Sequence, residues 1–164
     1  MTEFHSSAPF GGWDNELPIS ANDVVRRWRQ LLSTDRPWRY MPLYDVVGTM
    51  RAMLSELLDE GRDLDAAGRR GRMLCAAYDH GAFRRAQGCR REDITCEFGI
   101  LLDALDSAMA RRGMSRNLIR DALSILDADL ELAQQAAVAG WLGEPTRHRI
   151  RIESRFFKRP GGLE

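Results

Sequence analysis

The topology of this chain depends on residues 79–97, which read DHGAFRRAQGCRREDITCE. Gly88 lies between two segments of helical apolar periodicity and predicts a turn between antiparallel helices. Position 80 lies eight residues before Gly88 and position 97 lies nine residues after it. At a rise of about 1.5 Å per residue, both positions should lie roughly 12–14 Å from the turn. Because His80 and Arg84 share a helix face, we expect Glu97 to contact one of them across the two helices.

This contact has two interpretations. In the first it is a polar clamp that fixes the register of two helices, because half-buried polar groups must be paired. In the second it is a sensor of a ligand or a proton, because a histidine can change its charge in the physiological pH range. We favour the clamp.

The rest of the chain predicts further helices. Apolar stripes at helical spacing begin near Ser20, Leu43, Leu64, Ile94 and Ser115. Ser20 followed by an aspartate three residues later is typical of a helix start. No segment before residue 145 has the pattern of a strand. We therefore predict an all-α fold, an antiparallel bundle of about five helices in which short loops make sequential helices neighbours.

Composition limits the class of protein. The chain has 164 residues, with 24 basic and 24 acidic side chains, and 44% of its residues are hydrophobic. This length predicts one domain, and no window is apolar enough for a membrane span. The N-terminus lacks the pattern of a secretory signal, so we expect a cytoplasmic protein without membrane contact. The charge balance argues against a surface that binds nucleic acid as a whole, and without a recognisable reading helix we expect no sequence-specific nucleic-acid binding.

Three regions follow from these patterns. Residues 1–18 predict a flexible N-terminal arm, residues 19–143 a helical domain, and residues 144–164 a basic tail. Residues 143–162 carry six basic and two acidic side chains without a helical stripe. The tail is either a mobile terminus or a docking segment for an acidic partner. The docking residues would be Arg147, Arg149, Arg151, Arg155, Phe156, Phe157, Lys158 and Arg159.

Catalytic and metal-binding patterns find little support. A cysteine nucleophile would need Cys75, Cys89 or Cys96 beside His80, with a third group to orient the base. A zinc site formed by His80, Cys89 and Cys96 would lack the close ligand spacing of such sites, and no phosphate-binding glycine loop occurs. We therefore predict no enzyme activity, no metal and no cofactor.

Two tryptophans lie on the apolar stripes. Trp28 belongs to the first predicted helix and Trp141 to the last. We interpret both as anchors of the core or of a dimer interface, with the lining of a small apolar ligand site as the alternative.

The segment from His80 to Glu97 resembles the N-terminal sensor domain of the RsbR/RsbRD family of stress-signalling proteins. The similar elements are an early helix with Trp28, the run His80-Gly81-Ala82-Phe83-Arg84-Arg85-Ala86-Gln87-Gly88, and the run Glu97-Phe98-Gly99-Ile100-Leu101-Leu102. The resemblance spans about residues 20–142, and its specific part is 80–101. Leu102 departs from the family pattern, which has arginine there, so a charge network that uses this arginine is altered.

The resemblance implies a globin-related helical domain that lacks haem, dimerises through long helices and senses a signal or binds a partner. Our first hypothesis is therefore a stand-alone bacterial sensory or regulatory domain, a homodimer that contacts a signalling protein. An apolar stripe left exposed on the first or fifth helix would support it. The alternative is a helical sensor that binds a small molecule or haem in a cavity near His80.

Overall fold

The computed structural model describes residues 17–35, 38, 44–58 and 66–143. Within these ranges it contains five α-helices and no strand, which confirms the all-α prediction. They are α1 (Ala21–Thr34), α2 (Tyr44–Leu57), α3 (Ala66–Ala86), α4 (Arg91–Arg111) and α5 (Arg116–Leu142). The basic tail and almost all of the N-terminal arm lie outside the described residues.

Local signals set the ends of the helices. Ser20 and Asp23 form a reciprocal capping box at the start of α1, as the sequence predicts. Ser115 accepts a hydrogen bond from the backbone N–H of Leu118 at the start of α5. Gly143 ends α5 at a φ of 72°, a left-handed conformation that glycine adopts without strain. These caps satisfy backbone groups that a helix end leaves unpaired.

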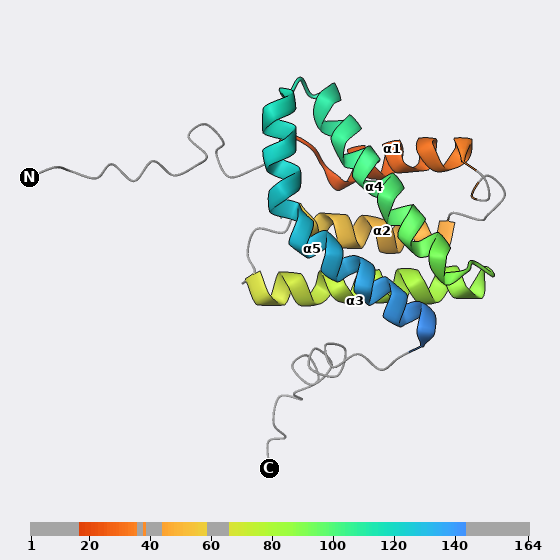
Figure 1. Cartoon of the computed structure of the whole chain (residues 1–164). Coiled ribbons are helices and arrows are strands. Elements are labelled where there is room, and N and C mark those ends of the chain that lie inside the picture. Colours follow the sequence, from red (N-terminus) through yellow and green to blue (C-terminus); the bar gives the residue numbers. More distant parts are fainter. Residues whose placement is uncertain (1–16, 36–37, 39–43, 59–65, 144–164) are drawn as a thin grey trace, which may run out of the picture.

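The helices form two layers. Figure 1 shows α1, α2 and α3 side by side in one layer, with α2 antiparallel to both α1 and α3, and with α4 and α5 lying across them. The most extensive contacts join α3 with α5 and α2 with α3. The α3–α4 pair differs from a regular hairpin, because α4 leans away from α3 after the turn at Gly88 and packs mainly on α1 and α5.

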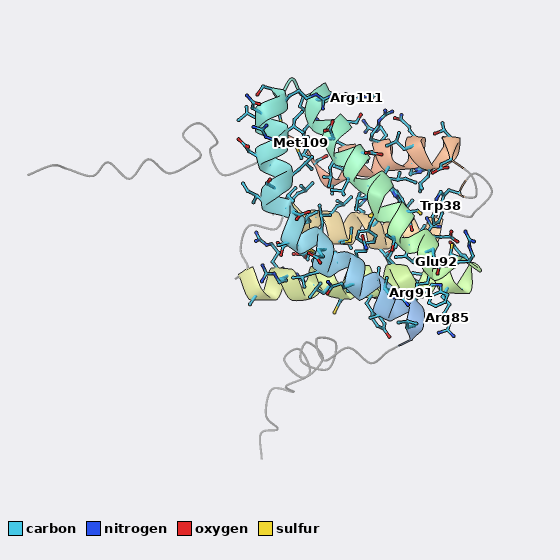
Figure 2. The ribbon with its side chains drawn as sticks, viewed as in Figure 1. Trp38, Arg85, Arg91, Glu92, Met109 and Arg111 are labelled. Carbon is cyan, nitrogen blue, oxygen red and sulfur yellow. The ribbon has the colours of Figure 1, made fainter. Side chains whose placement is uncertain are left out.

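The core lies between these layers, where side chains from all five helices meet (Figure 2). Trp28 is completely buried at its centre. The α3–α5 crossing is unusually close: a Cβ on Gly81 would lie 1.8 Å from the carbonyl oxygen of Ala137. On the other helix, a Cβ on Gly140 would lie 1.9 Å from the carbonyl oxygen of Tyr78. Two glycines therefore allow the two backbones to touch.

A buried charged cluster as candidate functional site

The predicted contact between α3 and α4 is present and wholly buried. His80 Nε2 lies 3.1 Å from Glu97 Oε2, and Arg84 Nε lies 3.1 Å from each oxygen of the same carboxylate. Arg84 Nη2 also donates to Glu97 Oε1. All three side chains are at most 1% exposed. Glu97 thus contacts both partners, whereas the sequence predicted one or the other.

Side chains from other segments complete this cluster. Thr49 Oγ1 on α2 lies 3.1 Å from His80 Nδ1, and Gln87 Oε1 accepts a hydrogen bond of 2.8 Å from Arg84 Nη1. The ring of Trp38 stacks on the Arg84 guanidinium at 4.7 Å, and the Trp28 ring lies 6.2 Å from the imidazole. We call these seven residues the buried cluster: Trp28, Trp38, Thr49, His80, Arg84, Gln87 and Glu97.

The electrostatics of the cluster favour an ionised carboxylate. Burial by itself raises the pKa of Glu97, but the charges and hydrogen bonds of His80 and Arg84 outweigh it. The pKa of Glu97 therefore lies below its usual range. Because a buried carboxylate without partners would be costly, Glu97 depends on its contacts with Arg84 and His80.

Both ring nitrogens of His80 have a protein partner. Thr49 Oγ1, which donates to the carbonyl oxygen of Val46 at 2.9 Å, lies beside Nδ1, and Glu97 Oε2 lies beside Nε2. The imidazole ring is therefore held between α2 and α4.

The two tryptophans that we predicted to be anchors lie in different surroundings. Trp28 is a core residue, and its indole N–H has no hydrogen-bond partner. Trp141 is half-buried at the end of α5, where its indole N–H donates to the carbonyl oxygen of Cys89 at 2.7 Å. Arg85, labelled in Figure 2, packs on the Trp141 ring and donates a hydrogen bond of 3.2 Å to the backbone carbonyl oxygen of Trp141. Trp141 therefore fastens α5 to the turn between α3 and α4.

The three cysteines differ in how deeply they are buried. Cys89 is buried at the turn, and burial raises the pKa of its thiol to about 11. Cys75 is half-buried and Cys96 is exposed. Among the described residues, no group of three His, Cys, Asp or Glu side chains is placed to hold a metal ion. The tail residues proposed to dock a partner lie outside the described ranges.

Thr49, Trp38 and Gln87 were not predicted as members of this site. Gln87 follows Arg84 by three residues, a spacing that places the two side chains together on a helix and could have identified it. Thr49 and Trp38 lie on segments whose positions depend on tertiary packing. No local pattern marks them.

Comparisons of the chain with models of known families, with curated proteins and with solved structures found no match. None of the described helices combines the length and the apolar character needed to cross a membrane.

Proposed function

We propose that this chain is a regulatory domain that forms a homodimer through α5 and acts on other proteins in signal transduction. The observation that supports this proposal is an apolar stripe on the outer face of α5. Leu118, Ile125 and Leu132 are 40%, 56% and 37% exposed. Their spacing of seven residues places them on one face of the helix, and exposed apolar stripes mark interfaces.

A second copy of the chain fits this stripe. A two-fold axis through Ile125 would place Leu118 of one copy opposite Leu132 of the other. The stripe is apolar at its centre and at both ends, as a self-complementary contact requires. With 27 residues, α5 is about 40 Å long, which allows an extended contact.

Charges beside the stripe are compatible with this arrangement. Pairing about position 125 brings Asp121 opposite Asp129 of the other copy. Asp129 is already neutralised by Arg70 at 3.0 Å, and Arg70 is 57% exposed.

The contacts of His80 argue against the haem-binding part of the alternative hypothesis. Both ring nitrogens of His80 have protein partners, Thr49 and Glu97. An axial haem ligand needs one nitrogen free for the iron. The resemblance to RsbR-type sensor domains supports the regulatory role that we propose.

Substitution of Ile125 by arginine tests the interface. The matched control is Ser124→Arg. The Ser124 side chain is also exposed, and it points about 100° away from that of Ile125 on the same helix. Native mass spectrometry and sedimentation velocity should show a dimer for the wild type and for Ser124→Arg. For Ile125→Arg we expect the dimer dissociation constant to rise about tenfold or more, because a charge is buried at the centre of the contact.

Circular dichroism should show the same helix content for all three proteins. A wild type that is monomeric at every concentration tested would refute the proposal. Equal weakening by Ile125→Arg and Ser124→Arg would refute the position of the interface.

A further inference from the structure

A surface pocket of about 510 Å³ lies where α1 and α2 meet. Arg26 and Arg29 line it from α1, and Arg51 lines it from α2. All three arginines are exposed. The other described residues that line it are Asn22, Val25, Gln30 and Ser33, so none of the described lining residues is a carboxylate.

Several other arginines of the described surface pair with carboxylates. These pairs are Arg70–Asp129, Arg72–Glu56, Arg90–Asp93, Arg112–Asp23 and Arg116–Asp106. In the part of the chain that the structure describes, Arg26, Arg29 and Arg51 have neither an ion pair nor a hydrogen-bond partner for their side chains.

Three guanidinium groups around one pocket repel one another and attract an anion. A guanidinium presents a planar fork of N–H donors that matches the oxygens of phosphate. A phosphate group offers more oxygens than a carboxylate, so it can accept from several forks at once. Neutral donors also line the pocket: the side-chain amide of Asn22, and the NH₂ group of Gln30, whose oxygen accepts a hydrogen bond of 3.3 Å from Arg27.

The size of the pocket indicates the size of the ligand. Its volume lies within the range of about 300–1,000 Å³ that is usual for small-molecule sites. We propose that this pocket binds a small soluble anion that carries phosphate groups. The proposal does not depend on the dimer interface, because the pocket is built from α1 and α2 and the apolar stripe lies on α5.

Titration calorimetry of the full chain with pyrophosphate, at constant ionic strength, tests this inference. We expect one saturable site for the wild type. Arg26→Gln and Arg51→Gln should each weaken binding about three- to tenfold, since each removes one charge-assisted contact in a partly exposed site. The matched control is Arg91→Gln, which removes an exposed arginine outside the pocket. Its affinity should equal that of the wild type.

Three results would overturn the inference. The first is no saturable binding of pyrophosphate. The second is the same loss for Arg91→Gln as for the two pocket variants, which would indicate a general effect of charge. The third is a ligand preference that does not fit a small soluble phosphate compound. Either citrate would bind as tightly as pyrophosphate, or the protein would bind only to vesicles that contain phosphatidic acid. The oligomeric state of each variant, measured in parallel, separates this test from that of the α5 interface.

Discussion

Replacement of Glu97 by glutamine tests whether the buried cluster holds the helices together. The wild-type carboxylate accepts hydrogen bonds from Arg84 and lies 3.1 Å from His80 Nε2. In Glu97→Gln the negative charge is lost, and one oxygen becomes an NH₂ group that points at other donors. Removing one partner of a buried ion pair costs about 3–5 kcal/mol. For a domain of this size, that loss lowers the melting temperature by about 6–20 °C.

Glu92→Gln is the matched control, because Glu92 is an exposed carboxylate on the same helix. Surface substitutions of this kind change the free energy of unfolding by about 0.5 kcal/mol or less. Thermal denaturation followed by circular dichroism at neutral pH measures both variants. If Glu97→Gln melted within a degree or two of Glu92→Gln, the cluster would not be a clamp and the reasoning would fail.

The pH dependence of the same pair gives an independent check. The pKa of Glu97 is lower in the folded protein than its ordinary value of 4.5. The stability that this shift contributes is therefore fully present above about pH 4.5 and is lost as the pH falls through the lowered folded pKa. The Glu97→Gln variant lacks this contribution to stability at every pH. The difference in melting temperature between wild type and Glu97→Gln should narrow as the pH falls below 4.5, and a constant difference would contradict the ion pair.

Two further predictions concern packing and thiol reactivity. Gly81→Ala should lower the free energy of unfolding by about 3 kcal/mol in urea denaturation, because the new Cβ meets the Ala137 backbone. Gly99→Ala should raise the free energy of unfolding by about 0.5–1 kcal/mol, since nothing lies within 4 Å of a Cβ at that position. Equal effects of the two substitutions would rule out the close crossing. Mass spectrometry after brief treatment with a thiol reagent at pH 8 should find Cys96 modified and Cys89 intact, because Cys89 is buried and its pKa is about 11. Rapid modification of Cys89 would contradict this placement.

The sequence predicted well those features that depend on local spacing. Ser20, Ser115 and Gly143 mark helix ends because capping involves residues within one turn of each other. The contact of His80 with Glu97 was predicted because both positions are set by their distance from Gly88. Helical rise alone places them at the same level.

Features that depend on distant segments were missed. The stacking of Trp38 on Arg84 requires the segment after α1 to return to the α3–α4 turn. The role of Gly81 was also not predicted, because its lack of a side chain matters only where Ala137 of α5 approaches it. The preference of α3 for α5 over α4 was also not predicted, because the apolar stripes do not specify which faces meet.

The buried cluster and the proposed dimer interface are connected through adjacent residues of α3. His80 belongs to the cluster, and Gly81 is in backbone contact range of Ala137 on α5. The close crossing leaves no side chain between α3 and α5 at this point. Trp141 fastens the end of α5 to the turn between α3 and α4. If the chain regulates through α5, as we propose, the helix that carries the apolar stripe is therefore joined at two places to the part of the fold that holds the buried cluster.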